Sequence, residues 1–109
     1  ESPNCVSSYA RDVVHRIDPF TYEGSGEEAL AEIQSLIENT DSAKVVYSSD
    51  DYLYAEYTSN ILGFVDDVEF YLDKEAEAIQ VRSASRLGQS DLGVNRQRIE
   101  TIRSQYEDF

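Results

Sequence analysis

The spacing of hydrophobic positions changes along the chain, and each spacing predicts a different kind of element. Between residues 29 and 37, apolar residues recur every three or four positions, which predicts an amphipathic helix. Ser25 precedes this stretch and Glu28 follows three positions later, the capping-box pattern that begins a helix. We therefore expect a helix from about residue 26 that ends at residues 39–41. Its apolar stripe consists of Ala29, Leu30, Ile33, Leu36 and Ile37.

From residue 43 the hydrophobic period falls to two, which is typical of strands. We expect four strands, at residues 43–49, 52–59, 64–72 and 79–86, and then a helix over residues 94–106. Short connections favour antiparallel neighbours, and two amphipathic helices need one sheet face to cover. The sequence predicts a two-layer α+β fold: a four-stranded antiparallel meander with two helices packed on one face.

Residues 1–24 show weak periodicity, and we expect an irregular N-terminal arm with one short helical stretch around residues 8–16. Residues 25–106 would carry the helix, four strands and helix, so that 1–109 is a single domain. The chain begins at Glu1 rather than methionine. We expect that a targeting segment has been removed; the alternative is that the numbering begins at a mature or trimmed end.

Charge and composition narrow the possible partners. Twenty-two acidic residues against nine basic ones give a net charge of −13, which repels nucleic acid and anionic lipid. No apolar run reaches the roughly 20 residues of a membrane-spanning helix. A single cysteine and a single histidine exclude multi-cysteine and paired-histidine metal sites. We expect no cofactor and no metal.

Parity arguments align the third and fourth predicted strands, because residues directly opposite each other share a face. If the two residue numbers of each cross-strand pair sum to 151, Glu69 lies opposite Arg82. If they sum to 149, Asp67 lies opposite Arg82. Either register puts an acid beside Arg82. We expect structural ion pairs among the charged residues of these strands, namely Asp66, Asp67, Glu69, Arg82 and Arg86.

Asp66 falls on the apolar face of its strand and therefore needs hydrogen-bond donors. Arg86, Ser85 or backbone amides of residues 88–93 would supply them. Two roles are open: a structural lock and a catalytic acid. Alternation points Asp66 away from Asp67 and Glu69, which argues against a shared cation site.

The arginines are concentrated near the C-terminus. Residues 82–109 carry five arginines against four acids, whereas residues 1–81 carry 18 acids against four bases. One interpretation is an anion pocket, for a ligand or for a partner's carboxylate. The other is that these arginines neutralise the protein's own acids. The candidate anion- or partner-binding residues are Arg82, Ser83, Ser85, Arg86, Asp91, Asn95, Arg96 and Arg98.

Two further features bear on chemistry and binding. Cys5 is a candidate reactive thiol, although no pattern links it to His15, and burial as a small apolar residue is the alternative. Five tyrosines fall in predicted strands, where they would form an interaction surface or stabilise cross-strand pairs. They are Tyr47, Tyr52, Tyr54, Tyr57 and Tyr71.

Four segments together resemble domain-of-unknown-function family 1499: residues 3–8 (PNCVSS), 63–70 (GFVDDVEF), 82–86 (RSASR) and 90–100 (SDLGVNRQRIE). The resemblance runs from residue 3 to about 103. It implies no established activity, an occurrence in proteobacteria, cyanobacteria and plastids, and often an N-terminal targeting or membrane segment. Gln89 departs from an expected aromatic, which argues against ring binding by that loop. The resemblance marks as signature positions Cys5, Asp66, Asp67, Glu69, Arg82, Ser83, Ser85, Arg86, Asp91, Asn95, Arg96 and Arg98.

These observations favour a non-catalytic accessory subunit that binds a protein partner, with no nucleic acid and no transmembrane segment. In a phototrophic source the resemblance implies a plastid protein bound peripherally to a membrane-embedded thylakoid complex such as a photosystem. In another bacterium it implies an extracytoplasmic or membrane-associated protein. The alternative is a small anion-binding module or enzyme that uses Arg82, Arg86 and Arg96 with Asp66.

Overall fold

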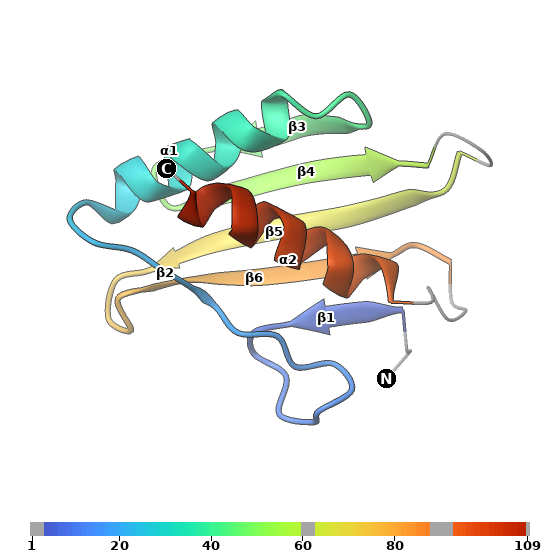
Figure 1. The fold of residues 1–109 in the computed structure, drawn as a ribbon, viewed down its shortest axis with the longest axis horizontal. Helices are drawn as coiled ribbons and strands as arrows, with labels where there is room; N and C mark the ends of the chain where they lie inside the picture. Colours follow the sequence, from blue (N-terminus) through green and yellow to red (C-terminus); the bar gives the residue numbers. More distant parts are fainter. Residues whose placement is uncertain (1–3, 60–62, 88–92, 109) are drawn as a thin grey trace.

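One antiparallel sheet of six strands forms the base of the computed structural model, which describes residues 4–59, 63–87 and 93–108 (Figure 1). The spatial order is β1-β6-β5-β4-β3, and β2 also pairs with β6. The last four strands follow each other as the predicted meander. The strands are β1 (Cys5–Ser7), β2 (Phe20–Thr21), β3 (Ala43–Ser48), β4 (Tyr52–Thr58), β5 (Val65–Asp73) and β6 (Ala78–Ser85).

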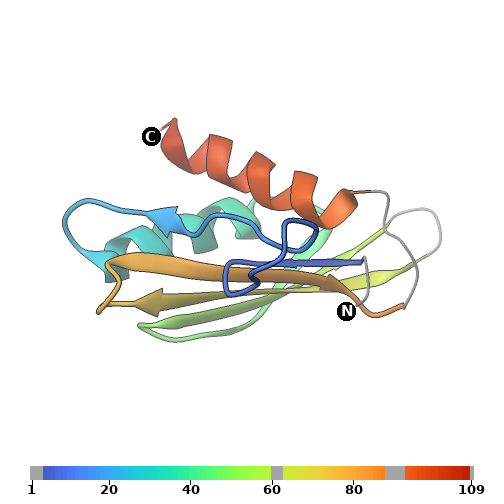
Figure 2. The ribbon, with the colours of Figure 1, turned by 90° about the horizontal axis from the view of Figure 1, so that it is seen from below.

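Both helices, α1 (Gly26–Glu38) and α2 (Val94–Glu107), cover the same face of the sheet (Figure 2). The predicted cap of α1 is confirmed, because the Ser25 hydroxyl accepts a hydrogen bond from the Glu28 amide at 3.2 Å. At Gly26 a Cβ atom would lie 2.5 Å from Leu72 Cδ1. Glycine therefore allows α1 to begin directly against β5.

The pairing of β5 with β6 fixes which residues share a face. Glu69 lies opposite Arg82, Phe70 opposite Val81, and Asp66 opposite Ser85. These position numbers sum to 151, so that register is confirmed and the register that sums to 149 is wrong.

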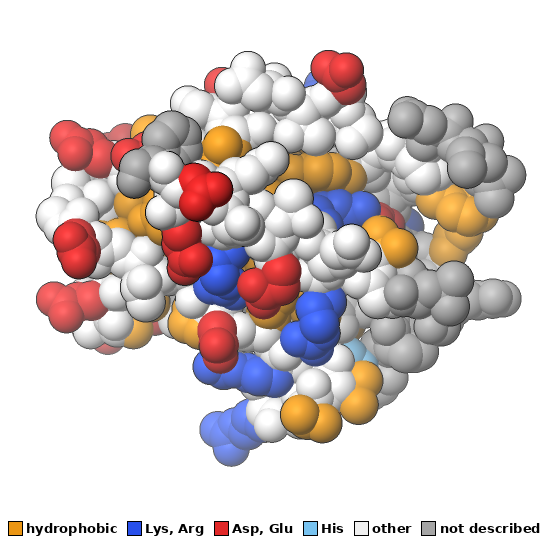
Figure 3. Space-filling model, in the orientation of Figure 1, with side chains coloured by type: hydrophobic (Ala, Val, Ile, Leu, Met, Phe, Trp, Pro, Cys, Tyr) orange, Lys and Arg blue, Asp and Glu red, His pale blue; other side chains and the backbone are white. Residues whose placement is uncertain are grey.

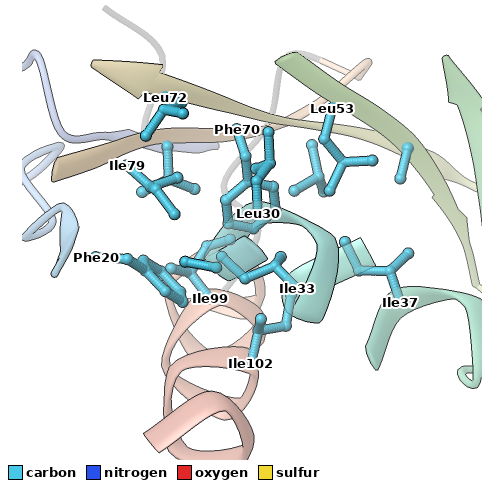
Figure 4. Close-up of a cluster of buried hydrophobic side chains, with 14 of the residues drawn as sticks. Phe20, Leu30, Ile33, Ile37, Leu53, Phe70, Leu72, Ile79, Ile99 and Ile102 are labelled. Carbon is cyan, nitrogen blue, oxygen red and sulfur yellow. The ribbon is translucent and has the colours of Figure 1, made fainter. Parts of the chain in front are cut away.

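The hydrophobic core lies between the helices and the sheet (Figure 4). Its largest fully buried side chains come from both helices, from three central strands and from β2. They are Phe20, Phe70, Ile33, Ile37, Leu53, Leu72, Ile79, Ile99, Val68 and Val81.

The N-terminal arm differs from the prediction in two ways. Residues 8–16 form turns rather than a helix, and the arm adds two strands, so the expected four-stranded sheet is wrong in strand number. β1 has three residues and β2 two, which is too short for a visible alternation of polar and apolar residues. Both obtain their ladder hydrogen bonds from β6. The arm buries Val6, Ile17 and Phe20 in the core.

Two arginines of helix α2 bind backbone carbonyl groups of this arm. Arg96 donates to the carbonyls of Val14 and Arg16, and Arg103 donates to those of Asp18 and Pro19, at 2.7–3.0 Å. These charge-assisted hydrogen bonds join the two ends of the chain. No helix of the described segments is both long enough and apolar enough to cross a bilayer.

Candidate functional site

The sheet presents a second face, which we call the open face because neither α1 nor α2 covers it (Figure 2). Four of the five strand tyrosines belong to it. Tyr57 instead points into the core and is 7% exposed. The open face carries Tyr47, Tyr52, Tyr54, Glu56, Asp67, Glu69, Tyr71 and Arg82.

One charge network on the open face is centred on Arg86, just after β6. Its guanidinium binds Asp67 with two hydrogen bonds, Nε to Oδ2 at 3.0 Å and Nη2 to Oδ1 at 2.9 Å. Nη2 also lies 2.8 Å from Glu56 Oε2, and the Tyr54 hydroxyl donates to Asp67 Oδ1 at 2.6 Å. The hydrogen bonds from Arg86, with a smaller contribution from Tyr54, lower the pKa of Asp67. Asp67 therefore stays ionised and Arg86 is held against the sheet.

A second network on this face joins Tyr52, Glu69 and Arg82. The Tyr52 hydroxyl donates to Glu69 Oε2 at 2.6 Å, and Arg82 Nη1 lies 3.6 Å from Glu69 Oε1. Burial, followed by the hydrogen bond to Glu69, raises the pKa of Tyr52 from 10.0 to about 12. Tyr52 is therefore a neutral donor at physiological pH.

The raised pKa of Tyr52 predicts a loss of stability in alkali. The unfolded chain releases this proton near pH 10, before the folded chain does, so the contribution is complete below pH 10 and disappears as the pH rises towards 12. Glu69→Gln removes the charge and should lower the pKa of Tyr52 part of the way towards 10, because burial remains. A ¹³C NMR titration of labelled tyrosine would measure this, with Tyr52→Phe to assign the signal. An unchanged titration in Glu69→Gln would contradict the role of Glu69.

On the opposite face, beneath α2, a polar cluster is enclosed in the structure. Arg98 Nη2 lies 2.7 Å from Asp66 Oδ2, and both side chains are at most 14% exposed. The Ser83 hydroxyl donates to Asn95 Oδ1 at 2.6 Å, and Arg98 Nη1 donates to the same oxygen at 2.9 Å. Arg98 also lies 4.7 Å from the ring centroid of Tyr57. A buried charge is tolerated here because it is paired and hydrogen-bonded.

Asn95 links this cluster to the first strand. Its Nδ2 donates to the carbonyl of Asn4 and to the Ser85 hydroxyl, both at 2.9 Å. Asn4 in turn donates to the carbonyls of Ser85 and Leu87. Across the described residues, every buried side-chain nitrogen and oxygen has a hydrogen-bond partner. We infer that the cluster stabilises the packing of α2 against β5, β6 and β1.

The ion-pair partner of Asp66 is an arginine that the prediction did not name. The prediction named Arg86, Ser85 or amides of residues 88–93, of which residues 88–92 lie outside the described residues. Arg86 is on the open face, whereas Arg98 from α2 reaches Asp66. A signal for this was present in the sequence. Arg98 is next to Ile99 and four positions before Ile102, so its place on the helix adjoins the apolar stripe that faces the core.

The arginines of the predicted anion pocket are not brought together. Arg82 and Arg86 are on the open face, whereas Arg96 belongs to α2 and binds carbonyls of the arm. The sheet lies between them, so these three do not share one site. Asp91, and the departure at Gln89, lie outside the described residues.

Cys5 and His15 lie in different parts of the N-terminal arm. Cys5 is partly buried on β1, opposite Ala84. His15 Nδ1 lies 2.6 Å from Asp12 Oδ2, in the loop between β1 and β2. The structure therefore assigns His15 a partner other than the Cys5 thiol.

An acidic hollow lies where α1 begins, near the β3–β4 turn and the β5–β6 turn. Lys74 crosses it to Glu27, with Nζ 2.6 Å from Oε2. Among the described residues, no three histidine, cysteine or acidic side chains are placed to hold a metal ion. The hollow is lined by Glu27, Ser49, Asp50, Asp51, Tyr71, Leu72, Asp73, Lys74 and Glu75.

Comparison with known proteins agrees with the resemblance in the sequence. A family model described as a protein of unknown function (DUF1499) matches residues 1–106, nearly the whole chain. No curated protein and no solved structure matches the chain significantly.

Proposed function

Because the chain belongs to the family of proteins of unknown function DUF1499, we propose its function from its own surfaces: it is a non-catalytic accessory subunit that docks on a larger assembly. The docking surface in this proposal is the open face of the sheet.

The observation that carries the proposal is a band of three tyrosines across neighbouring strands of the open face. Tyr52 lies opposite Tyr71 on β5, and its ring centroid is 6.0 Å from that of Tyr47 on β3. Tyr47 and Tyr71 are 56% and 43% exposed. Tyrosine gives a large contact area at a small entropic cost, which is why it is enriched in protein interfaces. We call these three residues the tyrosine band.

Charge favours a protein partner with a basic docking surface. The chain has a net charge of −13, and the arginines of the open face are already bound to its carboxylates. The face therefore offers fixed hydrogen-bonding groups rather than free cations for a small anion. Complementary charge on the partner would speed association and orient it.

The family distribution adds a cellular setting to the proposal. In a phototrophic source, the assembly would be a membrane-embedded thylakoid complex such as a photosystem, with this chain bound peripherally. In another bacterium, it would be an extracytoplasmic or membrane-associated complex.

The double variant Tyr47→Asp, Tyr71→Asp tests the tyrosine band. Both positions are exposed, so the fold should persist while the new charges oppose burial in an interface. We expect the tagged wild-type chain to co-migrate with a membrane complex of its source organism on native gels, and the double variant to migrate free. Val94→Asp is the matched control, because Val94 is 46% exposed but lies at the start of α2.

Two outcomes would overturn the proposal. In the first, the wild-type chain migrates free of every complex. In the second, the double variant co-migrates as fully as Val94→Asp does, which would remove the open face from the interface.

A further inference from the structure

The loop that joins β1 to β2 exposes two neighbouring valines. Val13 is 88% exposed and Val14 is 61% exposed. The loop projects beyond β1, at the edge of the sheet (Figure 1). Hydrophobic and basic side chains appear together at the same edge of the molecular surface (Figure 3). We call residues 11–16 of this loop the valine tip.

Basic side chains flank the valine tip, although the protein as a whole is acidic. Among the described residues, no carboxylate lies within 4.0 Å of Arg11 or Arg96, and Arg16 only reaches Asp18 at 4.0 Å. The other described arginines each lie closer to a carboxylate of the chain. Asp12, the acid within the tip, is bound to His15. The valine tip and Arg96 together carry three arginines against one aspartate, so positive charge exceeds negative charge where the valines are exposed.

Backbone carbonyl groups of the valine tip accept hydrogen bonds from other groups of the protein. The carbonyls of Val14 and Arg16 accept from Arg96, and the carbonyl of His15 accepts from the Ser7 amide at 2.8 Å. The Asp12 carbonyl accepts from the Arg16 amide at 2.9 Å. Backbone groups without partners are costly outside water, so this arrangement lowers the cost of entering a weakly hydrated phase.

We propose that the valine tip binds the surface of an anionic lipid bilayer. Val13 and Val14 enter the interfacial region, while Arg11, Arg16 and Arg96 remain at the level of the lipid phosphates. Long arginine side chains reach polar headgroups from such a position. Anionic lipid attracts each basic residue near its surface.

The shape of the tip favours a bilayer over a protein partner. Two valines on a projecting loop cover far less than the roughly 800 Å² that each partner contributes to a standard protein interface. Insertion into lipid needs no complementary pocket. The net charge of −13 does not prevent this, because charges more than about 8–10 Å away are largely screened at physiological salt. The molecule extends up to 39 Å. The net charge of the whole chain, which argues against binding to anionic lipid, therefore does not represent the local charge at the tip.

Vesicle sedimentation with the full chain tests the proposal, using phosphatidylcholine alone or mixed with phosphatidylglycerol. We expect binding to the mixed vesicles that weakens with salt. The double variant Val13→Asp, Val14→Asp should reduce partitioning by at least about tenfold, from the apolar surface it removes. Val46→Asp is the matched control, since Val46 is 46% exposed on β3, at the opposite edge of the sheet. Arg11→Glu should weaken binding to mixed vesicles more than it weakens partitioning to phosphatidylcholine alone, because the anionic lipid repels the new carboxylate.

Several results would overturn the proposal. The wild-type chain does not bind mixed vesicles, or Val46→Asp lowers binding as much as the tip variant does. Full displacement by inorganic phosphate would instead indicate a site for a free anion. Loss of native-gel co-migration in the tip variant, without vesicle binding by the wild type, would assign the tip to a protein interface. A negative result with vesicles would not bear on the docking proposal for the tyrosine band, because the two tests use different residues.

Discussion

Replacing Arg98 by alanine should destabilise the folded chain by about 3–5 kcal/mol, the usual effect of removing one partner from a buried ion pair. Asp66 would remain enclosed beneath α2 without its charged donor, since Arg98 Nη2 lies 2.7 Å from Asp66 Oδ2. Asn95 Oδ1 would lose the Arg98 donor, and the ring of Tyr57 would lose the guanidinium above it. Urea denaturation followed by circular dichroism measures this loss of free energy.

The double variant Asp66→Leu, Arg98→Met separates the effect of an unpaired charge from a general loss of packing. It removes both charges and puts apolar side chains in their place, so we expect it to be more stable than Arg98→Ala. Arg11→Ala is the exposed arginine control and should change stability little. A loss in Arg98→Ala below about 1 kcal/mol would mean that the cluster does not fasten α2.

Phe20→Ala should also cost about 3–5 kcal/mol, because a fully buried phenylalanine leaves a cavity that its neighbours fill only in part. The Phe20 ring meets Phe70 edge-on at 5.5 Å between centroids and Tyr106 at 5.7 Å. Arg103 lies 4.4 Å from its centroid. The substitution therefore disturbs β2, β5 and α2 together.

This substitution tests whether the N-terminal arm belongs to the core. Val13→Ala, in the same arm but exposed, should change the free energy of unfolding by less than about 0.5 kcal/mol. If thermal and urea unfolding showed Phe20→Ala to be as mild as Val13→Ala, the arm would be a detachable segment rather than part of the folded unit.

The elements in which a hydrophobic period persists over many residues were predictable from the sequence. The stripe of α1, its Ser25 cap and the alternation of β5 against β6 all follow local rules, because each is decided by neighbours in the chain or in a hairpin. Parity even placed Asp66 on the core face, where it is 8% exposed.

The features that the sequence did not predict depend on contacts between residues that are distant in sequence. β1 and β2 exist because β6 offers a free edge, which no pattern within residues 5–21 reveals. The pairing of Arg98 with Asp66 requires the position of α2 over the sheet. The Glu56 contact to Arg86 requires the β4–β5 register in addition to that of β5 with β6. The open-face network was therefore only partly predictable, with Glu69 opposite Arg82 as the part that parity gave.

The joining of the two chain ends has a consequence for biosynthesis. Asn4 reaches its partner Asn95 across 91 positions, and Cys5 pairs with Ala84. Asn4 and Cys5 are therefore translated well before the residues that pair with them, and they wait until β6 and α2 have followed. Long-range closure of this kind slows folding and leaves the β6 edge open to wrong partners in the meantime. A nascent chain that stalls before α2 emerges exposes that edge to chaperones and proteases.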